Sequence, residues 1–210
     1  MTAVVKGLPP VDLQRLYRQE YAASPEPGLV EVGRGRYLTI EGMGEPGGEN
    51  FQRRLQALYA AAYAVKSALR TAGGPDFVVS RLEGLWWGLR GPGDFTQEPP
   101  GDWNWKLMLR VPESVHAEHL QTAQSTLLAR GKDPVVGKVR LEDLEEGLCV
   151  QVLHMGPYDR EAETIAKMND FARRHGLLFH GLHHEIYLSD PRRTPPEKLK
   201  TILRMPAVRG

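Results

Sequence analysis

The sequence predicts an α+β protein in which an antiparallel sheet carries helices on one face and a ligand cleft on the other. Three observations lead to this prediction. Segments with helical spacing alternate with short strand-like segments rich in branched and aromatic residues. The 22 glycines and 16 prolines fall in blocks between these segments. The order of the predicted elements then repeats in the second half of the chain.

Each half is predicted to run strand, helix, strand, strand. The first half has residues 36–41, 50–70, 77–87 and 103–111, and the second has 148–154, 159–175, 182–188 and 199–205. A further helix over 114–130 joins the halves. The first long helix is predicted from apolar residues three and four positions apart, which lie on one helical face: Phe51, Leu55, Leu58, Ala62, Val65 and Leu69.

Short sequence matches support an internal duplication. Residues 39–44 (TIEGMG) match 151–156 (QVLHMG), 107–112 (LMLRVP) match 201–206 (TILRMP), and 82–86 (LEGLW) match 184–188 (HEIYL). We therefore expect an N-terminal extension over 1–27 and a single domain over 28–210. Its two modules, about 28–112 and 146–208, are joined by the helix at 113–131 and related by pseudo-twofold symmetry.

Composition excludes several classes of protein. With 27 basic and 26 acidic residues the net charge is +1, which argues against nucleic acid as a direct partner. The single cysteine, Cys149, excludes an internal disulfide and any multi-cysteine metal site. No apolar run reaches the ~18–20 residues of a membrane span, and residues 1–10 do not resemble a signal peptide. The expectation is a cytoplasmic monomer or weak homodimer without a membrane partner.

Two motifs suggest a cofactor or a metal ion, and both have a simpler interpretation. Residues 42–47 fit a dinucleotide fingerprint, but Pro46 removes one amide that would face the pyrophosphate. The adjacent His183 and His184 point to opposite faces of a strand, and no third ligand follows at a dependable spacing. We therefore expect neither a metal ion nor an organic cofactor.

The strand at 182–188 carries the most informative pattern. His183, Glu185 and Tyr187 share one face, and the mostly aliphatic alternate residues share the other. If the aliphatic set packs against the helices, Glu185 and Tyr187 stand together in the cleft, where a carboxylate and a phenol can act as base and hydrogen-bond donor. The alternative is an exposed, solvated face.

All four tryptophans fall in two neighbouring strands of the first half: Trp86, Trp87, Trp103 and Trp105. Adjacent Trp86 and Trp87 cannot both face the helices in a regular strand, whereas Trp103 and Trp105 share a face. Some of these rings are therefore expected to line the cleft and stack on a flat ligand. Glu83 is a candidate for a second carboxylate there, although Gly84 beside it leaves its face open.

Residues 154–159 (HMGPYD), 183–191 (HHEIYLSDP) and 198–204 (KLKTILR) resemble the GyrI-like small-molecule-binding family, part of the SOUL/GyrI superfamily. With 82–87 (LEGLWW) and 103–105 (WNW), the chain is most similar to its stand-alone branch. The resemblance covers about residues 28–208. It implies two strand–helix–strand–strand modules with a ligand cleft between them, in agreement with the duplication.

The resemblance implies three alternative functions. Some stand-alone members are cyclopropanoid cyclopropyl hydrolases, which detoxify DNA-alkylating natural products. Here Glu185 would act as general base, Tyr187 as hydrogen-bond donor, and Tyr158, His183 and the tryptophans as ligand contacts. Alternatively the chain is a non-enzymatic multidrug-binding module with Glu185 as anchor for a cationic aromatic ligand, or a gyrase-inhibitor-like protein. We favour the hydrolase because the tryptophans occur together with Glu185 and Tyr187. No cofactor is implied, and the expected partner is a hydrophobic aromatic small molecule.

Overall fold

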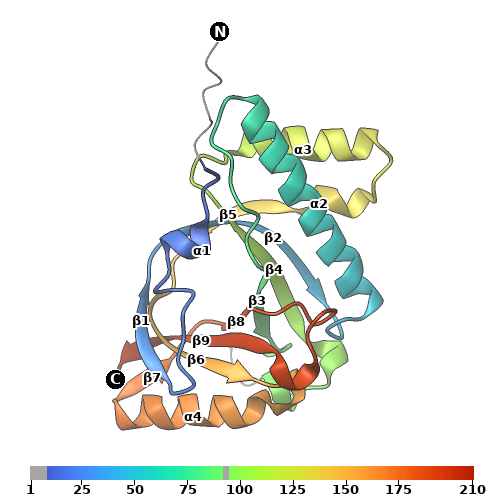
Figure 1. The fold of residues 1–210 in the computed structure, drawn as a ribbon. Helices are drawn as coiled ribbons and strands as arrows, with labels where there is room; N and C mark the ends of the chain where they lie inside the picture. The colour runs from blue at the N-terminus through green and yellow to red at the C-terminus, as the bar shows by residue number, and fades with distance from the viewer. Residues whose placement is uncertain (1–8, 92–94) are drawn as a thin grey trace.

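The computed structural model describes residues 9–91 and 95–210 and confirms the α+β class (Figure 1). Its described strands form one antiparallel sheet with the order β1-β6-β9-β8-β3-β4-β2-β5, and β7 pairs with β9. The strands are β1 (Gly28–Val32), β2 (Gly35–Met43), β3 (Glu83–Trp87), β4 (Asn104–Val111), β5 (Arg140–Leu144), β6 (Gly147–Met155), β7 (Leu177–Phe179), β8 (His183–Tyr187) and β9 (Lys200–Arg209). The helices are α1 (Leu13–Leu16), α2 (Glu49–Thr71), α3 (Ala117–Ala129) and α4 (Glu161–Arg174).

The strand order reflects the predicted duplication. Strands β6, β9 and β8 of the second module mirror β2, β4 and β3 of the first, and the modules meet where β8 pairs with β3. Glu83 pairs with Ile186 and Leu85 with His184. A twofold axis placed at the pair of Gly84 and Glu185 would exchange these two residues, and it would exchange Glu83 with His184. The sequence matches instead align Glu83 with Glu185, one residue further along the chain. A shift of one residue along a strand moves a side chain to the other face of the sheet.

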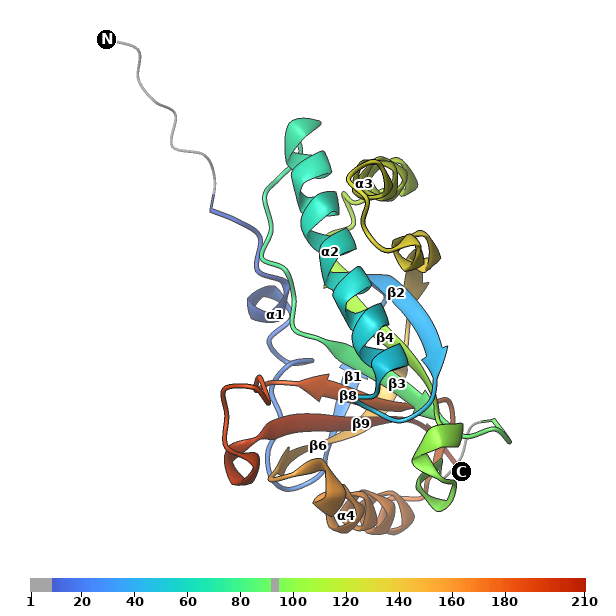
Figure 2. The same cartoon turned by 90° about the vertical axis from the view of Figure 1, so that its right-hand side faces the viewer.

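The long helices pack on one face of the curved sheet, at its two ends (Figures 1 and 2). Helix α2 covers β2 and β4 through a core that includes Leu58, Leu38 and Leu107, and α3 lies beside α2. Helix α4 covers β6 and β9 through Met168 and Leu203. No helix in the described part of the chain is long and apolar enough to cross a membrane.

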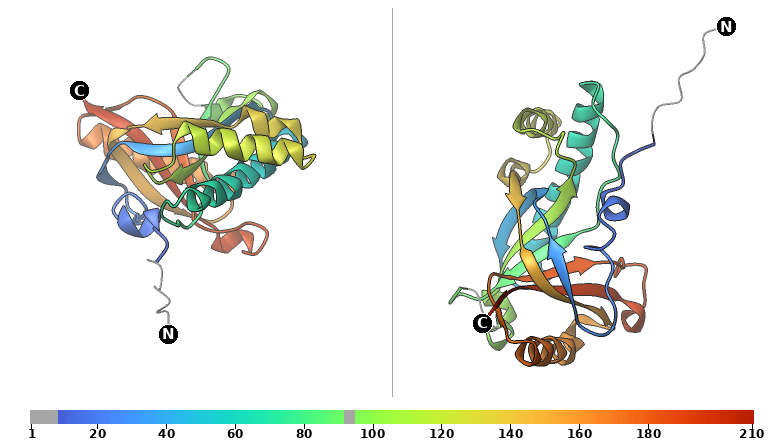
Figure 3. Two further views of the ribbon diagram at one scale, coloured as in Figure 1. Left: turned by 90° about the horizontal axis from the view of Figure 1, so that it is seen from above. Right: turned by 90° about the vertical axis from the view of Figure 1, so that its left-hand side faces the viewer.

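The opposite face is covered by the segment that precedes β1, which descends along the sheet (Figure 3). Val11 forms a parallel bridge with Phe77, and the backbone amide of Leu153 donates to the Ser24 carbonyl. The Arg110 guanidinium lies over the ring of Tyr17, 3.9 Å from its centroid. Residues 9–27 therefore pack as part of the folded body rather than as a free extension.

Some predicted boundaries change. Of residues 77–87 only Glu83–Trp87 form a strand, because the backbone at Phe77 pairs with the N-terminal segment instead. Helix α4 starts at Glu161 after a short 3₁₀ turn over Tyr158–Arg160. Strands β1, β5 and β7 were not predicted, and β5 has the polar composition RLEDL that is typical of an exposed edge.

Candidate functional site

Glu185 occupies the middle of a row of residues that crosses six strands of the sheet, from β6 to β2. The paired residues of this row are Val152, Leu203, Glu185, Gly84, Leu107 and Ile40, in that order. Directly paired residues point to the same face of a sheet. Val152 and Leu203 pack beneath α4, whereas Leu107 and Ile40 belong to the core beneath α2. Glu185 therefore lies on the helix-bearing face, between the two helical layers, and not on the opposite face as expected.

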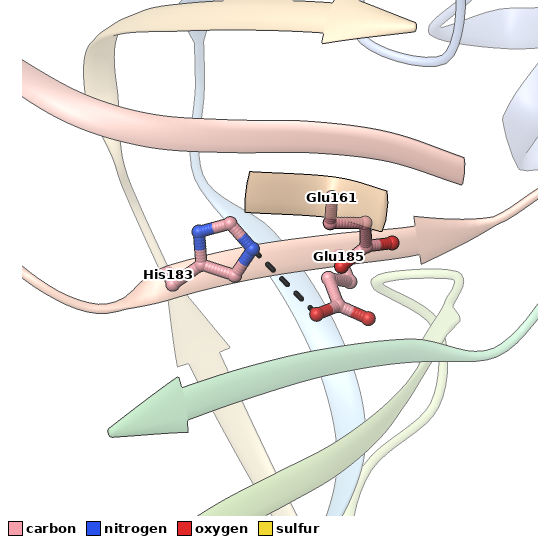
Figure 4. Close-up of side chains that lie close together, drawn as sticks. All are labelled: Glu161, His183 and Glu185. Atoms are coloured by element: carbon pink, nitrogen blue, oxygen red, sulfur yellow. Dashed lines mark ion pairs between the residues drawn. The ribbon is translucent and has the colours of Figure 1, made fainter. Parts of the chain in front are cut away.

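Three ionisable side chains come together at this position: Glu161, His183 and Glu185 (Figure 4). We call them the acid–histidine cluster. His183 and Glu185 are two residues apart on β8, and Glu161 reaches them from the first turn of α4. One donor atom from each residue lies within 4.8 Å of the others, and His183 Nε2 is 3.6 Å from Glu185 Oε1. All three residues are buried, with 6–8 % of their surface exposed.

The cluster brings two carboxylates together without a described lysine or arginine to balance them. Among the described residues no lysine or arginine forms an ion pair with Glu161 or Glu185. Burial, together with the charge of Glu185, raises the pKa of Glu161 well above its usual range. Burial and Glu185 also raise the pKa of Tyr187 well above its usual range, and that of Tyr158 to about 12. Both phenols therefore remain protonated donors at neutral pH.

Several polar atoms here have no hydrogen-bond partner among the described residues. They are His183 Nε2, Glu161 Oε1 and Trp86 Nε1. A Cβ atom added to Gly84 would lie 3.0 Å from Trp86 Nε1 and 3.3 Å from the Tyr187 hydroxyl. Because Gly84 has no side chain, the indole N–H of Trp86 and the hydroxyl of Tyr187 come together beside Glu185. Buried polar groups in native proteins are normally paired, so these atoms indicate a place for a ligand or water.

Aromatic rings adjoin the cluster on the side of α2. Trp86 stacks between Phe51 and Phe95 with centroid distances of 6.1 and 6.3 Å, and Trp103 meets its edge at 6.2 Å. The Phe95 centroid is 5.6 Å from that of His183. On the other side the ring of Tyr158, which is 40 % exposed, meets Tyr187 at 6.0 Å. Tyr158 is therefore the solvent-facing end of the site.

The predicted site residues fall into two groups. The structure brings His183, Glu185 and Tyr187 together with Trp86, Trp103 and Tyr158 on the helix-bearing face. Trp105 shares that face but is fully buried beneath α2, where its indole N–H donates to the Gly44 carbonyl. Trp87 lies on the opposite face, packed with Leu85 and Tyr37.

Glu83 also lies on the opposite face, within a buried ionic network. Its carboxylate accepts from the Tyr21 hydroxyl at 2.8 Å and lies 3.1 Å from His184 Nε2. Glu146 contacts the other ring nitrogen of His184 at 3.0 Å and binds Arg204 at 2.8 Å. Burial alone would lower the pKa of His184, but the two carboxylates outweigh it and raise the pKa to about 9. This arrangement satisfies Glu83 internally and separates it from Glu185.

Glu161 is the site residue that the sequence analysis missed. The fold brings it to His183 and Glu185 from another element, which spacing along the chain cannot show. These three residues are also the group in the described chain whose donor atoms are placed to hold a metal ion. An open hollow of about 440 Å³ beside α4 and β7 is lined by none of them; its walls include Asn169, Leu178 and Phe179.

The duplicated α+β fold, together with a buried acid next to aromatic rings, defines a small-molecule-binding domain. Residues 25–208 match the GyrI-like small molecule binding domain, and the chain belongs to this family. It is similar to an uncharacterized conserved protein from Listeria innocua, with 38 % identity, a TM-score of 0.88, and coverage of 94 % of this chain and 100 % of that one. A hydrolase from Listeria innocua shows 36 % identity, a TM-score of 0.87, and coverage of 95 % and 100 %. No functionally curated protein matches the chain.

Proposed function

We propose that this protein is a hydrolase that opens the cyclopropane ring of DNA-alkylating aromatic natural products and so detoxifies them, with Glu185 as general base. The observation that carries this proposal is the convergence of a buried carboxylate, the Tyr187 hydroxyl and the unpartnered Trp86 N–H around Gly84. Such a set can remove a proton and stabilise a developing oxyanion. The likeness to a Listeria innocua protein described as a hydrolase gives additional support.

The reaction adds one water molecule to the substrate. Glu185 takes a proton from water as the water oxygen bonds to the cyclopropyl carbon, and the carbon–carbon bond of the strained ring breaks. The electron pair of that bond moves into the conjugated carbonyl, which becomes a phenolate. A proton then returns to the phenolate oxygen, so that the product is the substrate plus one water.

The two donors at Gly84 are placed to act on the carbonyl. A phenol of ordinary pKa, about 10, is already protonated at neutral pH, and burial and Glu185 raise the pKa of Tyr187 further, so its hydroxyl can donate. Trp86 Nε1 is a second donor, and it has no competing partner among the described residues. Donors that are positioned in advance, where negative charge develops, lower the barrier without reorganising. The half-buried Trp103 and the exposed Tyr158 supply rings against which a flat substrate stacks.

A second candidate function is binding without turnover. It is favoured by the two buried carboxylates of the acid–histidine cluster, which form no ion pair with a described lysine or arginine and would attract a cationic aromatic ligand. A binder would release its ligand unchanged, whereas a hydrolase would release it hydrated.

Mass spectrometry separates these two functions. A cyclopropane-containing alkylator is incubated with catalytic amounts of the protein, and the product is compared with a buffer control. Repeated turnover to a species heavier by one water supports the hydrolase. Recovery of the unchanged compound at the rate of the buffer control would contradict it.

A further inference from the structure

We propose that Glu161, His183 and Glu185 bind one divalent transition-metal ion of the Zn²⁺ class. The inference does not rest on the proposed hydrolase activity. A bound ion would engage Glu185 as a ligand, so the ion-free protein is the form in which Glu185 would act as general base. Its basis is the donor set, the charge balance and the unpartnered atoms of Glu161 and His183.

The donor set is one imidazole nitrogen and two carboxylate oxygens. These atoms already lie within 4.8 Å of one another, and they come from two elements that the fold fixes, β8 and the first turn of α4 (Figure 4). Mixed imidazole and carboxylate ligands suit Zn²⁺ and its first-row neighbours, whereas Mg²⁺ and Ca²⁺ prefer oxygen ligands alone. The chemistry of the cluster therefore selects a transition-metal ion.

The charge of the cluster calls for a cation. Two buried carboxylates face each other, and no described lysine or arginine forms an ion pair with either. A buried charge without a partner is strongly unfavourable. A divalent ion between Glu161 and Glu185 would balance the charge of the carboxylates, and the His183 imidazole would supply a third ligand.

Two of the three proposed ligands have a buried atom without a hydrogen-bond partner in the described chain. His183 Nε2 and Glu161 Oε1 are buried and have no hydrogen-bond partner among the described residues. His183 is 6 % exposed and Glu161 is 8 % exposed, so their polar atoms point into the protein and not into solvent. An ion would replace the present contact of 3.6 Å between His183 Nε2 and Glu185 Oε1 and would use the unpartnered atoms of His183 and Glu161. Three protein ligands leave at least one coordination position for a small molecule, as in catalytic rather than structural zinc sites.

The test measures binding to the whole chain after removal of metal ions by a chelator. Calorimetric titration with Zn²⁺ is expected to show one ion per chain. Glu161→Gln and His183→Ala should each weaken binding by at least about tenfold, since each removes a ligand. Glu163→Gln and His180→Ala are the matched controls, because both residues are exposed on the same two segments of the chain, and they should bind as the wild type does.

Two further measurements keep the test decisive. Co²⁺ added to the wild type should give visible ligand-field bands of a low-coordinate site, a result that does not depend on how the variants fold. His116→Ala tests whether any binding arises instead from His116, which caps α3, and His119 in its first turn. The proposal is overturned if the wild type binds neither Zn²⁺ nor Co²⁺, or if Glu161→Gln and His183→Ala bind as tightly as the controls, or if His116→Ala alone abolishes binding.

Discussion

Glu185 and Gly84 lie directly opposite each other where the two modules of the sheet meet, and only one of the two has a side chain. A twofold axis placed at this pair would make the two positions equivalent, with an acid on β8 and the space over Gly84 on β3. Trp86 Nε1 and the Tyr187 hydroxyl border that space. The lack of a side chain at Gly84 thus lets an indole N–H and a phenol O–H approach the strand beside the acid.

Replacing Gly84 with alanine should abolish ligand binding and turnover. In Gly84→Ala the new methyl group would lie 3.0 Å from Trp86 Nε1, so we expect loss of ligand binding and of any turnover. The same crowding should lower the free energy of unfolding by about 1–3 kcal/mol. Dye binding, followed by fluorescence, and denaturant unfolding measure the two effects.

Gly33→Ala is the matched control, because a Cβ atom there meets nothing within 4 Å. It should leave both binding and stability close to the wild type. A Gly84→Ala variant that binds as well as Gly33→Ala would show that the ligand does not use this space.

The segment before β1 should contribute to stability through Tyr21. Its hydroxyl donates to the fully buried Glu83 carboxylate at 2.8 Å. Tyr21→Phe leaves that carboxylate with one donor fewer and should cost about 1–3 kcal/mol in denaturant unfolding. Tyr63→Phe, at a position that is 61 % exposed, should change the unfolding free energy little. Equal stability of the two variants would mean that the segment does not hold the sheet as described.

Glu146 should make the fold sensitive to acid. Burial alone would raise its pKa, but His184 and Arg204 outweigh burial and lower the pKa to about 2. A folded-state pKa below the unfolded value means that the stabilisation is complete above about pH 4.5 and is lost as the pH falls toward 2. Glu146→Gln removes this contribution and should cost on the order of 3 kcal/mol at neutral pH.

Denaturant unfolding of the wild type and Glu146→Gln over a series of pH values tests this prediction. The difference between their unfolding free energies should shrink as the pH falls from 4.5 toward 2. A difference that stays constant through this range would show that the ionisation of Glu146 does not stabilise the fold.

Much of the fold follows from local patterns in the sequence. Helical spacing from Phe51 to Leu69 predicts α2 within two residues at each end, and the alternation around Glu185 correctly places it on one face with His183 and Tyr187. The expectation that only one of Trp86 and Trp87 faces the helices is also met. Periodicity succeeds here because it depends only on neighbouring residues.

The face of the sheet that carries the site could not be predicted in this way. The pattern of β8 suggested that His184 and Ile186 face the helices, because they alternate with a charged and a phenolic residue. Both faces of β8 are in fact buried, since the N-terminal segment and the network around His184 cover the second one. A strand that is buried on both sides carries no amphipathic signal to orient it. Glu161 was missed for a related reason, because its contact with Glu185 joins two elements.

The most direct test compares the two candidate acids in the same hydration assay. Glu185→Gln and Glu83→Gln are each incubated with the cyclopropane-containing alkylator at a temperature at which circular dichroism shows both to be folded. We predict that Glu185→Gln gives no hydrated product above the buffer control, whereas Glu83→Gln continues to turn the compound over. Turnover by Glu185→Gln at the wild-type rate would contradict the assignment of the reaction to the acid between α2 and α4.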